Sequence, residues 1–357
     1  KWFASFHYVD WKGVNKRKKK TGFATRKEAQ EYERRFLEAE KDDPDIMFSA
    51  LVENYYLDIE SRMKPTTLVN KHAIIDSLLL PQFKDMKISA ITPAVIRKWQ
   101  NLLLDYTDSD GKEYSKTYLK AIHTQMSTIM HYAVRYYGLK QNPCTLAGVI
   151  GESNADEMKI WTREEFERFI TFEKSESYRV AFEILFYTGM REGELLALTK
   201  TDIPEDRKEI DINKTFATVN GEDLFLEPKT PWSKRVVQIH SRLHDEIMTL
   251  LSHMYLYEGE RIFYFKKAVL LNEFKRVARA AGLEPIRIHD LRHSHASMLI
   301  DMGVPITEIS KRLGHKNPSV TLRVYSHMYG SKERNIAQKI DGLFDPDDAS
   351  GDEAEST

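Results

Sequence analysis

Cysteine is almost absent from the 357-residue sequence, and long apolar runs are absent altogether. The single cysteine, Cys144, excludes an internal disulfide and any zinc site built from cysteines, which fits a reducing cytoplasm. No apolar run approaches the roughly 18 residues that a membrane span needs. A Gly-rich nucleotide loop, an HExxH pair and a defensible Ser-His-Asp arrangement are also missing. The length predicts two or three domains, and these absences predict a globular cytoplasmic protein.

The formal net charge of −1 hides opposite charges at the two ends of the chain. Residues 1–27 carry nine Lys or Arg against one acid, whereas residues 345–357 carry six acids and no base. A basic segment is attracted to the phosphates of nucleic acid, and a short acidic end of small residues is typical of disorder. The basic segment contains five consecutive residues that would also fit a solvated strand or turn, namely Lys16, Arg17, Lys18, Lys19 and Lys20.

Residues 1–41 have the pattern of a β-β-α unit. An aromatic-rich segment predicts a first strand, a turn follows, and a second strand carries the basic run. Thr25 and Glu28 form a capping-box pattern that predicts the start of a helix. A thin basic sheet backed by one helix suits the insertion of strands into a DNA groove, although an ordinary α+β module has the same pattern. The chain opens at Lys1 inside the first strand, so we expect further residues upstream.

Helical patterns fill residues 46–150, between polar segments at 41–45 and 151–157. Four helices are predicted there, because capping residues and proline mark several of their starts. They span Phe48–Glu60, a segment opened by Lys64-Pro65, a segment opened by Thr92-Pro93, and about 114–137.

Residues 157–343 combine helices with a short stretch of strands, and residues 345–357 form the acidic tail. Between Glu209 and His240 the apolar period changes to two, and Asn220-Gly221 is a two-residue hairpin signal, so we predict a three-stranded sheet. The fold class predicted for the chain is mainly α with small β-sheets (α+β). Helices are expected after Thr162, which forms a capping box with Glu165, and at about 273–281, 289–302, 306–313 and 331–343.

The last of these domains contains basic and nucleophilic residues that share one economical explanation. Taken singly, none is persuasive, because a lone His in a helix or a Tyr near the C-terminus is usually structural. A phosphodiester is an anion, so attack on it by an oxygen nucleophile requires neutralised non-bridging oxygens and a protonated leaving oxygen. The set comprises Arg191 in Thr188-Gly189-Met190-Arg191-Glu192-Gly193-Glu194-Leu195, Lys229 in Pro228-Lys229-Thr230, His289 and Arg292 in His289-Asp290-Leu291-Arg292-His293, His315 in Leu313-Gly314-His315, and Tyr325 in Thr321-Leu322-Arg323-Val324-Tyr325-Ser326-His327.

In this order and in these local contexts, the six residues closely resemble the active site of the tyrosine recombinase, or phage integrase, family. The resemblance covers nearly the whole chain: residues 1–41 resemble the arm-site DNA-binding domain, 46–150 the SAM-like helical core-binding domain, and 157–343 the catalytic domain. Arm-binding domains of this kind usually have three strands. Only two are predicted here, which supports the expectation that the N-terminus is truncated.

The resemblance assigns phosphate binding to the basic residues. Arg191 and Arg292 would each grip phosphate oxygens through a planar, permanently charged fork. His289 and Arg292 are three apart on a predicted helix and therefore share one face. His315 would donate a further hydrogen bond. Glu194, three residues after Arg191, would either buttress that arginine or be a solvated helical residue.

Tyr325 is the nucleophile in this interpretation, and its attack would form a 3′-phosphotyrosine and free a 5′-hydroxyl. Lys229 would act as the general acid on the 5′-oxygen, with Lys234 in the same turn region as its rival. Tyr329, one helical turn further on, is the rival nucleophile, although the Thr-x-x-x-Tyr-x-His phrase is centred on Tyr325. The mechanism needs no metal, ATP or other cofactor.

The function that the resemblance implies is an integrase that cuts and rejoins DNA at attachment sites, integrating or excising a prophage or an integrative or conjugative element. Its expected partners are core-type and arm-type double-stranded DNA, further copies of the chain in a tetramer, an excisionase and a host DNA-bending protein. The alternatives are a type IB topoisomerase-like relaxing enzyme and a catalytically idle DNA-binding protein on the same scaffold. A zinc site is a weak hypothesis, suggested by His293, His295 and His327.

Overall fold

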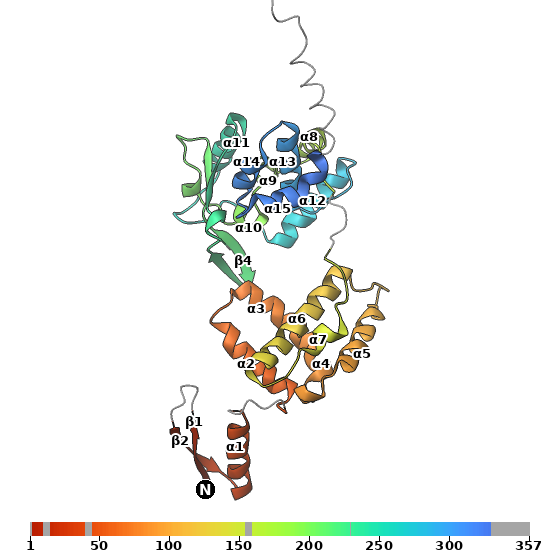
Figure 1. The fold of residues 1–357 in the computed structure, drawn as a ribbon. Helices are drawn as coiled ribbons and strands as arrows, with labels where there is room; N and C mark the ends of the chain where they lie inside the picture. The colour runs from red at the N-terminus through yellow and green to blue at the C-terminus, as the bar shows by residue number, and fades with distance from the viewer. Residues whose placement is uncertain (1, 10–14, 40–44, 154–158, 229, 330–357) are drawn as a thin grey trace, which may run out of the picture. The chain divides into compact units, whose positions relative to one another are not determined.

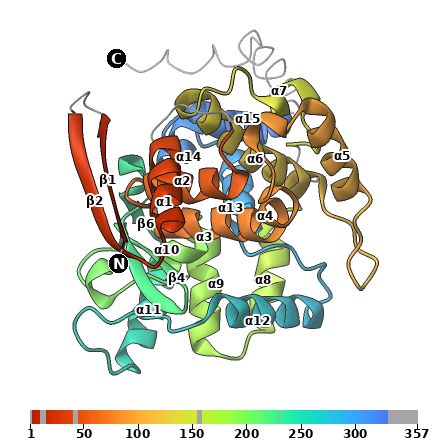
Figure 2. The same cartoon turned by 90° about the horizontal axis from the view of Figure 1, so that it is seen from below.

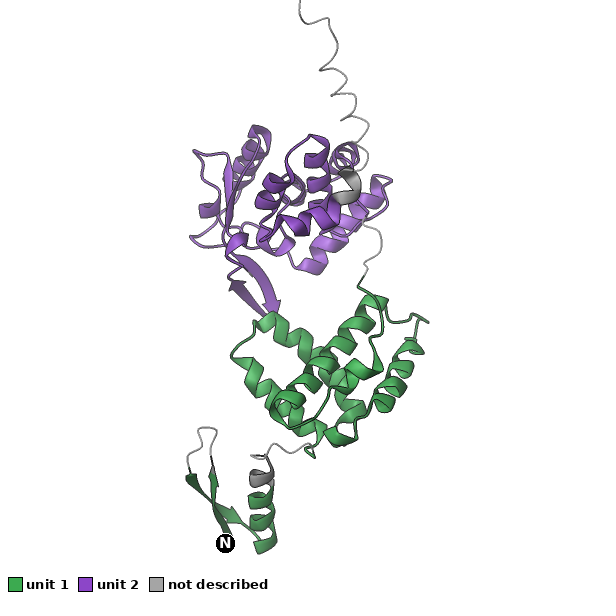
Figure 3. Ribbon diagram, in the orientation of Figure 1, with its two compact units in different colours: residues 1–156 green, residues 157–357 purple. Residues whose placement is uncertain are grey.

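The computed structural model describes residues 2–9, 15–39, 45–153, 159–228 and 230–329. The chain divides into two units, residues 1–156 and residues 157–357 (Figure 3). Helices dominate both and the sheets are small, so the predicted mainly α fold class is confirmed. Among the described residues, no helix has the length and apolar character that crossing a membrane requires.

The first unit begins with a two-stranded antiparallel sheet and one helix (Figure 1). Ala4 and Phe6 are buried against Ala29 of that helix. The hydroxyl of Thr25 accepts a hydrogen bond from the backbone of Glu28, so the predicted helix start is confirmed. The elements are β1 (Trp2–Val9), β2 (Asn15–Phe23) and α1 (Arg26–Ala39).

The register of this sheet distributes the basic run over both of its faces. Residues opposite the buried Ala4 and Phe6 share the face that α1 covers, and the residues between them point to the uncovered face. Arg17 is on the uncovered face, where its Nε donates to Oγ of Ser5 at 3.1 Å. Lys19 is on the same face, with its ammonium 5.1 Å from the centre of an aromatic ring of β1. The face towards α1 carries the remaining basic residues, Lys16, Lys18 and Lys20.

The four helices predicted between residues 46 and 150 are present. The hydroxyl of Thr92 accepts from the backbone of Val95, and that of Ser115 accepts from the backbone of Tyr118, as expected of N-cap residues. Their apolar faces form one core. The elements besides the second helix are α2 (Phe48–Glu60), η2 (Ile88–Ala90), α5 (Pro93–Leu104), α6 (Lys116–Tyr136) and the short α7 (Pro143–Ala147).

The second helix of this core contains a π-helical turn, which the sequence did not predict. Pro81 has no N–H, and its ring would clash with the carbonyl four residues earlier, so the regular hydrogen-bond ladder cannot continue through it. The extra residue of a π turn accommodates this proline. The helix runs as α3 (Pro65–Ile74), η1 (Ile75–Leu79) and α4 (Leu80–Phe83).

The second unit is built around α9 (Glu176–Thr188), which contacts α8, α11 and α13 (Figure 2). An aromatic cluster joins it to its neighbours, since the ring of Phe274 lies 5.1 Å from Trp161 and 5.5 Å from Phe182. The predicted capping box of Thr162 is present at the start of α8. The helices besides α9 are α8 (Arg163–Thr171), α10 (Glu192–Leu195), η3 (Lys200–Asp202), η4 (Pro231–Ser233), α11 (Ser241–Ser252), α12 (Lys267–Ala280), α13 (Asp290–Asp301), α14 (Ile306–Leu313) and α15 (Pro318–Tyr329).

The predicted three-stranded sheet of the second unit is wrong, because the described strands form two separate two-stranded ladders. Asn213 and Lys214 interrupt the first predicted strand, since both side chains bind the buried carboxylate of Asp202. The two halves of that strand therefore pair with different partners. The ladders are β3 (Glu209–Ile212) with β6 (Arg235–Gln238), and β4 (Thr215–Val219) with β5 (Glu222–Leu226).

The hairpin signal in this region is confirmed. Asn220 and Gly221 connect β4 and β5 and have φ values of 52° and 84°. Positive φ at both central residues defines a type I′ turn, which Asn-Gly favours. The helix predicted at 331–343 and the acidic tail lie outside the described residues.

A pair of carboxyl groups lies between α9 and α11. Glu183 is 3% exposed, and burial, then a hydrogen bond with Glu246, raises its pKa to about 8. Burial acts in the same direction on Glu246, but the hydrogen bond from Glu183 and the guanidinium of Arg242 outweigh it and lower the pKa of Glu246. At neutral pH, Glu183 is therefore the protonated member and donates to the Glu246 carboxylate.

We predict that Glu183→Gln stabilises the protein at pH 8 and has little effect at pH 5. The folded state holds a proton on Glu183 that the unfolded state releases above its pKa of 4.5, so this group lowers the free energy of unfolding as pH rises towards 8. An amide imitates the protonated carboxyl, and we expect a gain of about 2 kcal/mol at pH 8 in urea denaturation. Glu167→Gln, at an exposed pair with Arg163, is the control and should change stability by under about 0.5 kcal/mol at both pH values. An equal effect of Glu183→Gln at both pH values would contradict the assignment.

Candidate active site

The turn at Gly189 joins the end of α9 to two other segments of the second unit. Gly189 has a φ of 64°, and a Cβ atom there would lie 2.7 Å from Cδ2 of His295 and 2.8 Å from Cδ2 of Leu313. Glycine is therefore required both by the backbone conformation and by the lack of space. The Gly189 carbonyl accepts a hydrogen bond from Nη1 of Arg292 at 2.7 Å, and Arg191 follows two residues later.

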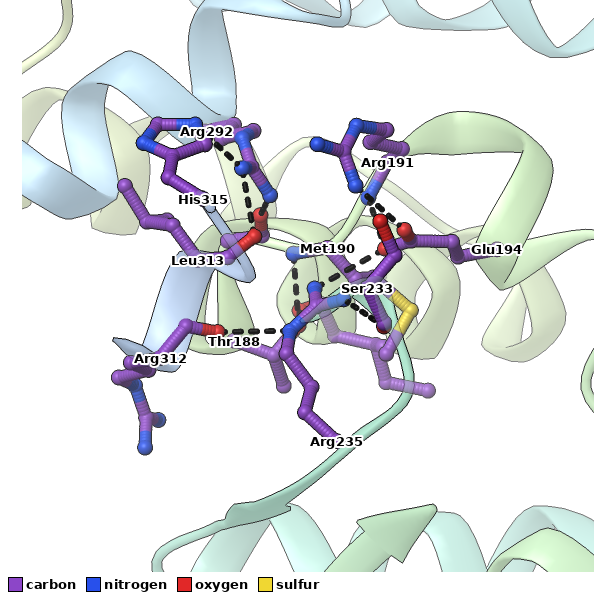
Figure 4. Close-up of polar contacts among 12 residues, drawn as sticks. Thr188, Met190, Arg191, Glu194, Ser233, Arg235, Arg292, Arg312, Leu313 and His315 are labelled. Carbon is purple, nitrogen blue, oxygen red and sulfur yellow. Dashed lines mark hydrogen bonds and ion pairs between the residues drawn. The ribbon is translucent and has the colours of Figure 1, made fainter. Parts of the chain in front are cut away.

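Glu194 buttresses Arg191, and the alternative of a solvated helical glutamate is wrong. Its carboxylate accepts from Nη1 of Arg191 at 2.7 Å and from Nη2 of Arg235 at 3.0 Å, and the residue is only 3% exposed (Figure 4). Burial alone would raise the pKa of Glu194, but Arg235 and then Arg191 outweigh it and hold the pKa below its ordinary value. Glu194 therefore remains a carboxylate that fixes the direction of Arg191.

Arg292 is buried, and backbone carbonyls hold its guanidinium in place. Nη1 donates to Gly189, and Nη2 donates to the Leu313 carbonyl at 2.6 Å and to Nε2 of His315 at 2.9 Å. Burial and the positive charges of Arg191 and Arg235 lower the pKa of Arg292 to about 9, so it is still charged at neutral pH. These contacts use three of the five N–H donors of a guanidinium, which leaves two for an anionic ligand.

His315 is a neutral imidazole with its proton on Nδ1. Arginine has no acceptor, so Nε2 must accept from Arg292, and Nδ1 then donates to Oγ1 of Thr321 at 2.7 Å. Burial, and then the nearby guanidiniums, lower the pKa of His315 to about 4. The predicted hydrogen-bond donation by His315 to a phosphate therefore requires that Nε2 gain a proton, which an anion beside it would favour.

His289 and His293 lie one turn apart where α13 begins. Their rings meet edge to face with centres 5.3 Å apart. Desolvation, then the interaction with the neighbouring His293 and the positive charges of Arg292 and Arg191, lower the pKa of His289 to about 4, although the residue itself is exposed. His289 shares a helix face with Arg292, and His293 belongs to the site through its contacts with His289 and Tyr325.

Tyr325 is buried at 2% exposure, with its ring in a small cluster that includes Ile300 and Leu313. Its phenolic oxygen lies 2.6 Å from Nδ1 of His293, within hydrogen-bonding distance. Burial raises the pKa of Tyr325, and Arg292 opposes this shift. The candidate nucleophile is therefore a neutral phenol that is withdrawn from solvent beside a neutral imidazole.

The other candidates are placed less fully. Lys229 lies outside the described residues. Lys234, its rival, is exposed, and its ammonium is paired with the carboxylate of Glu227 at 3.2 Å. Tyr329 ends α15, and its side chain is not among those that the structure describes.

Three residues of the cluster were not among the six candidates. Arg235 contacts Glu194 and the Arg312 carbonyl, and Arg312 donates to Nε2 of His295 and to the carbonyl of Tyr187. His293 contacts Tyr325. In the sequence, His293 stood out only for its place directly after Arg292 and for the weak zinc hypothesis, and no signal singled out the two arginines. No group of three or more His, Cys, Asp or Glu that could hold a metal ion occurs in the part of the chain that the structure describes.

We predict that Glu194→Gln lowers the free energy of unfolding by about 3 kcal/mol at pH 7, because it leaves Arg235 buried without its carboxylate. The pKa of Glu194 is lowered in the folded state, so its contribution is present above the unfolded pKa and is lost as pH falls below it. The difference between wild type and variant in urea denaturation should therefore shrink below about pH 4. Glu192→Gln, which removes a looser pair with Lys267 at 3.5 Å, should cost under about 1 kcal/mol. Equal losses in the free energy of unfolding would show that Glu194 contributes no more than a loose ion pair, which would contradict its role in holding Arg191 and Arg235.

Three family models match successive parts of the chain. Residues 159–332 match the phage integrase family, residues 47–104 match the phage integrase N-terminal SAM-like domain, and residues 1–39 match an arm DNA-binding domain. The second unit and both parts of the first thus carry a match.

Whole-length relatives and solved structures agree with these matches. The ICEBs1 integrase of Bacillus subtilis strain 168 is 31% identical over 343 residues, covering 90% of this chain and 91% of that protein. The integrase of Staphylococcus phage L54a is 28% identical and covers 84% and 93%. Two structures share the fold at 17% identity: the Tn1549 transposon integrase with a circular intermediate DNA (TM-score 0.69; 83% and 99% covered) and a lambda integrase dimer on a COC′ core site (TM-score 0.59; 90% and 92% covered). The chain belongs to the phage integrase family and is a tyrosine-type site-specific DNA recombinase.

Proposed function

We propose that this recombinase cleaves and rejoins DNA at the attachment sites of a mobile element through a 3′-phosphotyrosine intermediate on Tyr325. The observation that carries the proposal is the position of Arg292. Its guanidinium bonds His315 directly and is within electrostatic range of both Arg191 and Tyr325. A phosphate bound between the two arginines would therefore lie near the phenol.

The electrostatics of the site support phosphoryl transfer. Arg191 and Arg292 are fixed before any ligand arrives, so little reorganisation is needed when charge develops on the non-bridging oxygens. The positive excess that lowers the pKa values of His289 and His315 would be offset by the phosphate. Both imidazoles could then become donors to the phosphate oxygens.

The leaving 5′-oxygen needs a proton, and we assign its donation to Lys229. The pairing of Lys234 with Glu227 on the surface makes Lys234 the weaker candidate. A hairpin precedes the proposed acid, and its strand β5 ends at Leu226. Attack by the freed 5′-hydroxyl on a partner strand's phosphotyrosine would complete the exchange without a metal, ATP or other cofactor.

Double-stranded DNA is the proposed partner of all three parts of the chain. Residues 1–41 would bind arm-type sites, 46–150 the core-type site, and 157–343 would carry out catalysis. The DNA-bound integrases among the solved structures of similar fold support this partner. Strand exchange requires several protomers, so we propose a tetramer on paired sites, assisted by an excisionase and a host DNA-bending protein, in the cytoplasm of a bacterial cell.

We predict that Tyr325→Phe abolishes covalent attachment to DNA. Wild-type protein, incubated in EDTA with a nicked suicide duplex that carries the element's attachment site, should form an SDS-resistant adduct, and the variant should form none although it binds the duplex in a gel shift. Tyr329→Phe is the matched control and should retain the adduct. An adduct from Tyr325→Phe would transfer the nucleophile's role to Tyr329, and the absence of an adduct from wild type on bound DNA would favour the idle DNA-binding alternative.

The open face of the N-terminal sheet gives a second prediction. Arg17→Ala with Lys19→Ala removes two positive charges from the uncovered face, and Lys16→Ala with Lys18→Ala removes two from the face towards α1. If the uncovered face contacts phosphates, the first pair should reduce the slope of log K against log salt on arm-type DNA by about 1.8. The second pair should reduce it by less than half as much. The two double variants have the same net charge. Equal slopes would therefore show that the uncovered face does not contact phosphates in preference to the face towards α1.

A further inference from the structure

We propose that His293 accepts the proton of Tyr325 when the phenol attacks the phosphate, and returns it when the strand is rejoined. The inference rests on the proposed function and adds a catalytic base to it. Its structural basis is the contact between Nδ1 of His293 and the phenolic oxygen of Tyr325. The two atoms lie 2.6 Å apart, within hydrogen-bonding distance.

A neutral phenol is a poor nucleophile, and the site makes this problem worse. Burial raises the pKa of Tyr325, so the phenolate is not available at neutral pH. A nucleophile of this kind needs an adjacent base within hydrogen-bonding reach. His293 satisfies this requirement in position and in protonation state, because desolvation also lowers its pKa and leaves the imidazole neutral.

The fold places this imidazole next to the phosphate-binding residues. His293 follows Arg292 directly on α13, and His289 lies one turn earlier on the same face, with its ring in edge-to-face contact with His293. Tyr325 comes from α15, and its ring centre lies 5.8 Å from that of His293. His293 is therefore close both to the nucleophile on α15 and to the phosphate-binding residues at the start of its own helix, α13.

The atoms balance in a single displacement. The phenolic oxygen forms a bond to phosphorus while its proton passes to Nδ1 of His293, which becomes an imidazolium. The bond from phosphorus to the 5′-oxygen breaks, and that oxygen keeps the electron pair and takes a proton from the general acid assigned to Lys229. Rejoining reverses each transfer, so His293 then protonates the departing phenolate.

The test separates proton transfer from positioning. Asparagine in His293→Asn places an amide oxygen near the site of Nδ1, where it still accepts a hydrogen bond but cannot take a proton. On the nicked suicide duplex, we expect adduct formation to slow about 100-fold with DNA binding unchanged. Wild-type rates should fall as pH is lowered through the pKa of His293, and this dependence should be absent in the variant. His253→Asn, at an exposed pair with Glu176, is the control and should react at the wild-type rate.

Two chemical substitutions, one in the tyrosine and one in the DNA, further separate proton transfer to His293 from positioning by it. Replacing Tyr325 with 3,5-difluorotyrosine yields a phenol that ionises near neutral pH without help, so it should bring the rate of His293→Asn to within about tenfold of its His293 counterpart. In the otherwise wild-type chain the same replacement should flatten the pH dependence, a measurement that does not require the Asn variant to fold. A duplex with sulfur in place of the bridging 5′-oxygen needs no general acid, so it should rescue Lys229→Ala but not His293→Asn.

The outcomes distinguish this inference from the function on which it rests. An adduct in Tyr325→Phe would overturn the proposed nucleophile itself. If Tyr325→Phe is inactive but His293→Asn reacts at the wild-type rate, His293 is not the base and the phosphotyrosine mechanism stands. A slow variant that difluorotyrosine does not rescue, or that the sulfur substrate does rescue, would equally overturn proton transfer from Tyr325 to His293.

Discussion

The organisation of the catalytic unit depends on a concentration of positive charge. Among the described residues, one buried carboxylate, that of Glu194, contacts it and partly offsets it. Four arginines, Arg191, Arg235, Arg292 and Arg312, converge from four separate segments, and Glu194 bonds two of them. Backbone carbonyls accept six further hydrogen bonds, from Arg235, Arg292 and Arg312. Because carbonyls carry partial charges only, the cluster keeps a net positive field. A site preorganised in this way is suited to an anion whose charge increases in the transition state.

The same field sets the protonation states around it. It acts with desolvation to keep His289 and His315 neutral, and it opposes the rise in the pKa of Tyr325 that burial causes. Phosphate binding would reverse much of this effect on the two histidines, since an adjacent anion favours the charged imidazole. Substrate binding and activation of the donors are thereby coupled through electrostatics, without a change of fold.

The backbone fixes the positions of the charged side chains. Gly189 must be glycine, because any Cβ would meet His295 and Leu313, and its carbonyl fixes Arg292. Gly314, which ends α14 in the left-handed conformation, similarly brings the chain to His315. Two helix ends and the start of α13 therefore define the positions of the phosphate-binding groups.

Features that depend on neighbouring residues could be predicted from the amino-acid sequence alone. The helix starts at Thr92 and Thr162 and the Asn220-Gly221 turn are local, since each signal lies within a few residues of the bond that it predicts. The mainly α class and the family followed from such patterns and from motifs in chain order. Sequence order could reveal which residues carry the chemistry, but it could not reveal their contacts.

The long-range pairings, in contrast, could be read only from the folded chain. The bond of Arg235 to Glu194 spans 41 residues and that of His293 to Tyr325 spans 32, so no local pattern encodes them. The split of the predicted sheet depended on the capture of Lys214 by Asp202, 12 residues away. These contacts form because buried charged and polar groups need hydrogen-bonding partners. The fold as a whole determines which partners lie within reach of each group.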